Sequence, residues 1–280
     1  MASRYKLLLI VPVLLLLFSV GFLAYNYTTT GDWFLRAIEL KGGTLINLNV
    51  DEFPDINALE TALSARFGKV QIRESRSFAG NALSIELSSE ADSQEVLQEL
   101  ESLGIDTSQH SLGSIGPALG ETFFAQAQMA VIVAFIIMGI IVFAIFRKLI
   151  PSFAVMLAAA SDIITTLALM QIFSIELSLA ALAALLMLIG YSVDTDIMLT
   201  TRLLRGTHAL TRRVKGALKT GLTMSITSIG ALTALYLASI SPVLSQIAAV
   251  LLIGLIVDLV NTWLQNSVLL RWHLERRGAE

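Results

Sequence analysis

The chain has 280 residues, of which 55% are hydrophobic and only 15% are charged. A soluble globular protein of this length exposes far more charge, so the composition excludes that class and indicates an α-helical polytopic membrane protein. The formal net charge is -3, and the chain has no cysteine, which excludes disulfides and thiolate metal sites.

The first apolar run covers residues 7–25 and follows two basic residues, Arg4 and Lys6. No small-residue cleavage site comes after it, and it is longer than the apolar core of an ordinary signal peptide. Residues 1–25 are therefore predicted to form a cytoplasmic N-terminus and the first transmembrane helix.

Residues 26–122 are polar and carry fifteen acidic and six basic side chains. Apolar alternation predicts strands at 44–50, 70–75 and 82–87, and helical spacing predicts helices at 55–67 and 92–103. A closing strand is expected near 105–110. This order of elements is typical of a small α+β, ferredoxin-like domain. The acidic excess indicates a solvated face, because no metal-ligand spacing recurs.

Five further apolar runs lie at 126–146, 152–173, 178–201, 221–239 and 244–270. Each is near or above the ~20 residues that cross a ~30 Å hydrocarbon core, so residues 123–270 are predicted to hold transmembrane helices 2–6. Basic residues gather in the 2–3 link, around the 4–5 link and in the tail 271–280. The positive-inside rule then places both termini in the cytoplasm and residues 26–122 outside the cell membrane.

Four carboxylates lie within the predicted spans: Asp162, Asp194, Asp196 and Asp258. A charge at the bilayer centre costs about 2.5–3.5 kcal/mol on insertion scales. No lysine or arginine is predicted at the same depth. The four groups must therefore be protonated, share hydrogen bonds, bind a cation or face water. They form either a proton-relay site or hydrogen-bonded contacts between helices.

Asp194 and Asp196 point about 200° apart on a helix, so they cannot both face one partner. The turn around Asp194 is crowded with small and polar residues, which favours Asp194 as the functional group. In the last span, Asp258, Asn261 and Gln265 share one helix face.

Three motifs carry a family resemblance: Glu39-Leu40-Lys41-Gly42-Gly43-Thr44, Ile115-Gly116-Pro117-Ala118-Leu119-Gly120 and Gly190-Tyr191-Ser192-Val193-Asp194. Together with six spans and one domain between spans 1 and 2, they resemble the SecF family of protein-export membrane subunits, most closely its archaeal type. That family lies with SecD in the resistance-nodulation-division superfamily.

The resemblance implies a non-enzymatic, auxiliary subunit of the Sec translocase in the cell membrane. Its implied partners are SecD, the SecY channel, translocating preproteins and membrane lipids, with no nucleic acid, cofactor or metal. The resemblance also implies coupling of export to the proton gradient, for which a span-4 carboxylate and a span-5 arginine are the family's proposed relay residues. The bacterial pattern places that acid where Thr195 stands here. The span-5 arginine of that pattern is absent from this sequence: Thr223 stands near its place, with Lys219 about one turn toward the cytoplasm.

Other functions remain open from sequence alone. Half of a small-molecule transporter of the same superfamily would need a larger outer domain than ~100 residues. A purely structural scaffold for SecD would need no titratable group in the membrane. An intramembrane aspartyl protease using Asp194 and Asp258 is disfavoured, because the chain has no Gly-x-Gly-Asp motif.

Overall fold

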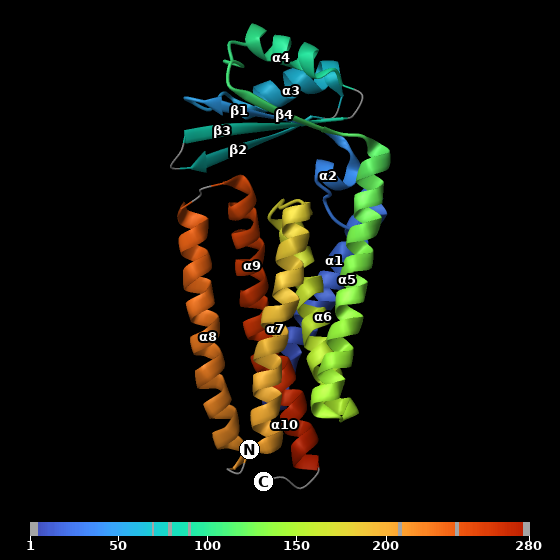
Figure 1. Ribbon diagram of the computed structural model, residues 1–280, viewed down its shortest axis with the longest axis vertical. Helices are drawn as coiled ribbons and strands as arrows, with labels where there is room; N and C mark the ends of the chain where they lie inside the picture. The colour runs from blue at the N-terminus through green and yellow to red at the C-terminus, as the bar shows by residue number, and fades with distance from the viewer. Residues whose placement is uncertain are drawn as a thin grey trace.

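The computed structural model describes residues 5–68, 70–77, 80–88, 91–206, 209–238 and 241–276. Long helices stand side by side as a bundle, and a small sheet with two helices covers one end of it (Figure 1). Both chain ends lie at the opposite end of the bundle (Figure 1).

Six helical segments among the described residues are long and apolar enough to cross a membrane, as the sequence predicted. The first combines a short 3-10 turn, Tyr5–Leu9, with α1 (Ile10–Thr30). The next four are α5 (Pro117–Phe146), α6 (Leu149–Ile172), α7 (Leu179–Arg205) and α8 (Leu210–Ala238). The sixth runs from α9 (Pro242–Val260) through a π-helical segment (Asn261–Asn266) into α10 (Ser267–Arg276).

The helices extend beyond the apolar runs that the sequence marks. α5 begins at Pro117, nine residues before the predicted start at 126, because proline is well suited to the first turn of a helix. α8 begins at Leu210 instead of residue 221. Arg212, Arg213, Lys215 and Lys219 therefore lie on this helix instead of in a loop.

The sheet has four antiparallel strands, β1 (Gly43–Val50), β2 (Gln71–Ser77), β3 (Gly80–Leu87) and β4 (His110–Ile115), in the order β2-β3-β1-β4. Helices α3 (Ile56–Phe67) and α4 (Ser93–Ser102) cover the face turned away from the bundle (Figure 1). Asp55 and Asp92 cap these helices: the Asp55 side chain accepts hydrogen bonds from two backbone N–H groups of the first turn, and the Asp92 side chain accepts one.

Apolar side chains from alternate strand positions meet the two helices in one core, which includes Ile46, Leu63, Ile85 and Leu100. Each of these four side chains is fully buried. Burial of this apolar face fixes the register of the sheet, since a slip of one residue would turn it toward water.

The closing strand lies later in the chain than the sequence predicts, at His110–Ile115 instead of near 105–110. Ile105 still packs against the core, and the Asp106 carboxylate accepts a hydrogen bond from the Ser108 N–H, which turns the chain before the strand. Because β4 is an exposed edge strand, its sequence carries no clear alternation between apolar and polar residues.

Two glycine motifs join the sheet to the bundle. A Cβ added to Gly120, in the first turn of α5, would lie 2.5 Å from the Gly42 backbone nitrogen. One added to Gly42 would lie 2.6 Å from the Pro117 Cα, and Gly42 has φ +81°. Gly43 follows with φ +146°. The backbones of α2 (Ile38–Lys41) and α5 approach this closely only because both positions lack a side chain.

Candidate functional site

Three aspartates from three different spans meet inside the bundle. Asp162 lies on α6, Asp196 on α7 and Asp258 on α9, and none of the three has any solvent exposure. We call these three carboxylates and the polar side chains that contact them the aspartate cluster.

Asp162 is fully engaged. One carboxylate oxygen accepts a hydrogen bond from the Ser192 hydroxyl at 2.6 Å, and the other accepts from the Asn261 amide at 2.7 Å. Ser192 belongs to the span-4 motif, so the motif serine binds an acid on the neighbouring helix. These two bonds join α6 to α7 and to the last span.

Asp196 and Asp258 share a donor. Oδ1 of Asp196 accepts from the Asn266 amide at 2.6 Å, and the Thr262 hydroxyl lies 3.0 Å from Oδ1 of Asp196 and 3.0 Å from Oδ1 of Asp258. A hydroxyl has one hydrogen, so Thr262 can donate to only one carboxylate at a time. The second oxygens of Asp196 and Asp258 are buried and have no hydrogen-bond partner among the described residues.

The π-helical segment supplies most of the donors. Its wider turn brings four polar residues into the interior, Asn261, Thr262, Gln265 and Asn266, all buried. Such segments often mark functional sites in helices. Sequence reasoning identified Asn261 and Gln265 but missed Thr262 and Asn266. The four polar residues stand at i, i+1, i+4 and i+5, which is broader than one face of an α-helix. This breadth is the sequence pattern that could have indicated Thr262 and Asn266.

No lysine or arginine forms an ion pair with these three carboxylates in the described part of the chain. Three buried acids cannot all ionise together without a cation, because the self-energy of each charge and their mutual repulsion both oppose it. The arrangement can therefore hold protons or a small cation. The described residues include no group of three or more acidic or histidine side chains placed to hold a metal ion.

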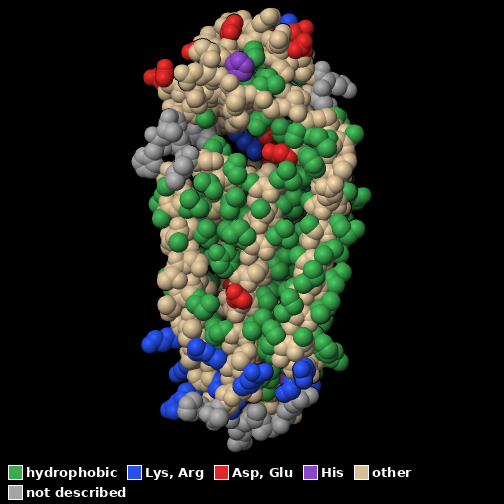
Figure 2. All heavy atoms as spheres, viewed as in Figure 1, with side chains coloured by type: hydrophobic (Ala, Val, Ile, Leu, Met, Phe, Trp, Pro, Cys, Tyr) green, Lys and Arg blue, Asp and Glu red, His purple; other side chains and the backbone are tan. Residues whose placement is uncertain are grey.

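The structure places Asp194 away from this cluster. Asp194 is exposed, and it shares one face of α7 with Met187, Gly190 and Tyr191, which are also exposed. Figure 2 shows an acidic side chain set into the apolar face of the bundle. We call these four residues the α7 outer face. On α8, Thr223 is exposed as well, and its hydroxyl donates to the Lys219 carbonyl of its own helix at 2.9 Å.

A second group of charges lies where the sheet meets the bundle. Glu176, in the link between α6 and α7, is only 1% exposed. Arg73 of β2 forms an ion pair with Glu176, and Lys41 lies 4.0 Å from it. Glu86 of β3 lies 3.4 Å from Lys41 and 3.9 Å from Arg73. Burial, with repulsion from Glu86, raises the pKa of Glu176 to about 7.

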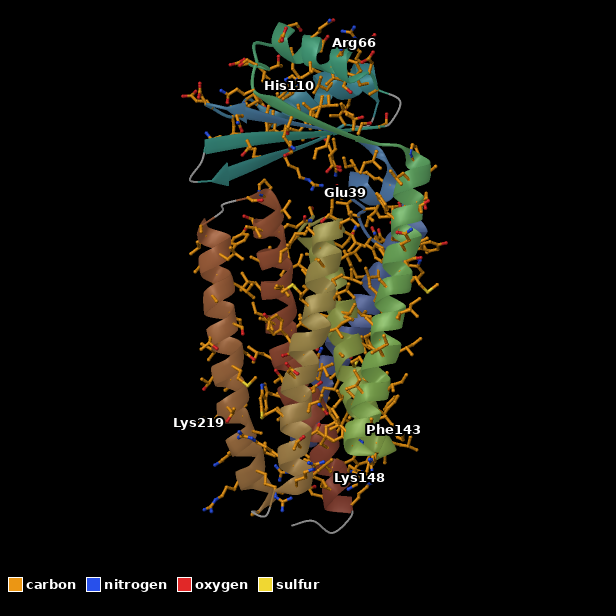
Figure 3. The ribbon with its side chains drawn as sticks, viewed as in Figure 1. Glu39, Arg66, His110, Phe143, Lys148 and Lys219 are labelled. Carbon is orange, nitrogen blue, oxygen red and sulfur yellow. The ribbon has the colours of Figure 1, made fainter. Side chains whose placement is uncertain are left out.

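This junction borders a cavity of about 540 Å³, which Glu39 also lines. Figure 2 shows basic and acidic side chains together in the hollow below the sheet, and Figure 3 shows Glu39 at the same level. The backbone closes the junction on one side, since the Ala37 N–H donates to the Leu177 carbonyl at 3.0 Å and the Leu177 N–H donates to the Leu35 carbonyl at 2.7 Å.

Fold and site together define a polytopic membrane protein with a small α/β domain at one end and a buried acidic cluster between its spans. Comparison with known proteins gives the family. Residues 95–276 match the model of the protein export membrane protein SecD/SecF, C-terminal. The chain therefore belongs to the SecD/SecF family of protein-export membrane proteins.

Individual relatives agree with this family. The protein-export membrane protein SecF of Methanothermobacter thermautotrophicus is 39% identical over 99% of this chain and 95% of its own length. SecF of Pyrococcus furiosus is 38% identical over 98% of this chain and 93% of its own length. These names describe export proteins and not enzymes, which agrees with the sequence prediction.

A solved structure has the same fold. The translocon-associated membrane protein SecDF of Thermus thermophilus superposes with a TM-score of 0.79 at 23% identity, over 98% of this chain. The chain spans only 38% of that longer protein.

Proposed function

We propose that the chain is an auxiliary subunit of the Sec translocase, which pairs with SecD and promotes export of preproteins through the SecY channel. Its relatives are named SecF, and the SecDF structure that it resembles is a longer chain of which it matches 38%. Both termini lie in the cytoplasm in this proposal, and residues 26–122 lie outside. In support, the described basic residues of the spans gather at one end of the bundle and the sheet lies at the other (Figure 2).

The proposal divides the chain into a first span within residues 1–25, an outer domain at 26–122, spans 2–6 at 123–270 and a tail at 271–280. The outer domain is of the ferredoxin-like type. The strand order β2-β3-β1-β4, with one helix between β1 and β2 and another between β3 and β4, supports this type.

The α7 outer face is the contact with SecD. An aspartate exposed to lipid near the middle of a span costs about 2.5–3.5 kcal/mol, so Asp194 calls for a polar partner or water on that side. Gly190 lies one turn away on the same face, and no atom lies within 4 Å of a Cβ built on it, which leaves room for close approach of a second helix.

The aspartate cluster couples export to the proton gradient. The observation that carries this part is the convergence of Asp162, Asp196 and Asp258, with Thr262 placed to donate to either of two carboxylates. Proton uptake or release there would change which helices are joined by hydrogen bonds. In this way an intramembrane charge change would reach the packing of α6, α7 and the last span.

The export role is tested in vesicles that contain SecY, SecD and this chain. Vesicles with the chain are expected to export more preprotein per unit time than matched vesicles that contain SecY and SecD alone. Equal export rates in the two preparations would reject the role.

A further inference from the structure

A hollow of about 490 Å³ opens between the end of α7 and the start of α8. Its lining is unusually basic, since four of its seven described residues are arginines and none is acidic: Thr201, Arg202, Arg205, Gly206, Arg212, Arg213 and Gly216. We call it the arginine hollow. It lies at the end of the bundle where basic side chains gather (Figure 2).

Two of the arginines are held in place by backbone carbonyl groups. Arg202 donates from Nη1 to the Gly216 carbonyl at 2.7 Å, and Arg213 donates from Nη1 to the Leu203 carbonyl at 3.0 Å. Gly206 is needed for this packing, because a Cβ there would lie 2.7 Å from the Arg213 Cδ. The two helix ends are thereby joined across the hollow.

The other two arginines have no such partner. Arg205 and Arg212 are exposed, and neither forms a hydrogen bond or an ion pair with a described residue. The positive-inside rule accounts for basic residues at this end of the bundle. It does not account for four of them around one hollow, two anchored and two with free guanidinium groups.

We propose that the arginine hollow binds the phosphate of an anionic lipid headgroup. The planar guanidinium fork fits two phosphate oxygens at once, which a lysine ammonium cannot do. The hollow lies at the end of α7 and the start of α8, two helices long and apolar enough to cross a membrane, and such a crossing would place it near the lipid headgroups. Basic pockets between helices on the cytoplasmic side of a membrane, where the proposed function places this end of the bundle, are suited to such headgroups.

The test uses the full chain in detergent and counts retained phosphatidylglycerol by native mass spectrometry, with phosphatidylcholine as the neutral reference. The variant is Arg205→Gln with Arg212→Gln. The matched control is Lys215→Gln with Lys219→Gln, which removes the same charge from α8 outside the hollow. Both lysines are exposed, and Figure 3 shows Lys219 on the outer side of α8.

The arginine variant is expected to bind phosphatidylglycerol about fivefold more weakly for each charge removed, while the lysine control binds nearly as the parent does. Equal weakening in both variants, or no weakening in either, would overturn the proposal. Inorganic phosphate is the third probe. If millimolar phosphate displaces phosphatidylglycerol from the parent chain, the hollow is a site for soluble anions and the lipid assignment is wrong.

A folding defect is separated from lost binding by a second variant, Arg205→Lys with Arg212→Lys, which keeps both charges. It is expected to retain more phosphatidylglycerol than the glutamine variant. Arg205→Lys with Arg212→Lys is then compared with Arg205→Gln with Arg212→Gln. If both lose phosphatidylglycerol equally while both unfold at the same temperature as the parent, charge is not the basis of binding and the proposal fails.

Discussion

The Asn266 amide donates a 2.6 Å hydrogen bond to the carboxylate of Asp196, which joins the π-helical segment of the last span to α7. Both residues are fully buried. A buried hydrogen bond contributes only modestly to the free energy of unfolding. Leaving its buried acceptor without a donor, however, costs about 1–3 kcal/mol.

Replacing Asn266 by leucine is therefore expected to destabilise the chain by about 1–3 kcal/mol. The loss comes from Asp196, whose remaining donor, Thr262, is shared with Asp258. Thermal unfolding in detergent measures this loss of stability. Asn57→Leu on the exposed side of α3 is the control, and an equal loss in the control would show that the Asn266 bond contributes nothing specific.

Changes at Asp194 are expected to affect the partner instead of the fold. Asp194→Leu should leave the unfolding temperature of the isolated chain nearly unchanged, because the side chain is exposed. On co-purification, Asp194→Leu should recover much less SecD than the parent does. Asp194→Asn, which keeps a polar group, should recover more SecD than Asp194→Leu. Ile140→Ala, on the exposed side of α5, is the control. Undiminished recovery of SecD by Asp194→Leu would move the contact to another face.

Close backbone packing predicts that Gly120→Ala destabilises the chain by about 1–3 kcal/mol, because the new methyl group meets the Gly42 backbone. Gly113→Ala is the matched control, since a Cβ at that position meets no atom within 4 Å. Chemical or thermal unfolding compares the two variants. Equal stability of Gly120→Ala and Gly113→Ala would show that α2 and α5 can separate without cost.

Glu176 gives the junction a pH dependence. Its ordinary pKa is 4.5, and in the folded chain the pKa is about 7, so between these values the folded protein holds a proton that the unfolded chain has released. Stability from this group is therefore greatest below about pH 4.5 and falls, by up to about 3 kcal/mol, as the pH rises to about 7.

The Glu176→Gln variant cannot titrate, so its unfolding temperature should change less between pH 5 and pH 7.5 than that of the parent. Glu52→Gln, at an exposed site of the α/β domain, should keep the parent slope. If Glu176→Gln and the parent show the same slope, Glu176 does not titrate in this range.

Hydropathy and length were enough to predict six spans, since a helix that crosses the hydrocarbon core needs about 20 apolar residues whatever its neighbours are. Alternation located the strands of the sheet that bury one face, such as the one containing Ile46. It failed for β4, because an exposed edge strand has no buried face to mark.

The site was harder to predict, because it depends on how helices pack. Sequence spacing shows that Asp194 and Asp196 point in different directions, but only the positions of α6 and α9 decide which one is buried. The crowded motif turn favoured Asp194, whereas the structure buries Asp196. The π-helical segment was not predicted either, because helical spacing assumes 3.6 residues per turn and a π-helical turn departs from that value.

The most direct test of proton coupling through the aspartate cluster is preprotein export in vesicles that contain SecY, SecD and this chain, measured with and without an imposed proton gradient. Asp196→Asn is the variant, because it removes the titrating group while the amide can still meet Thr262 in the π-helical segment of the last span. We predict that the gradient stimulates export in the parent but not in Asp196→Asn, with export in the absence of a gradient equal in the two. Full stimulation by the gradient in Asp196→Asn would contradict the proposal and leave the cluster as a set of structural hydrogen bonds.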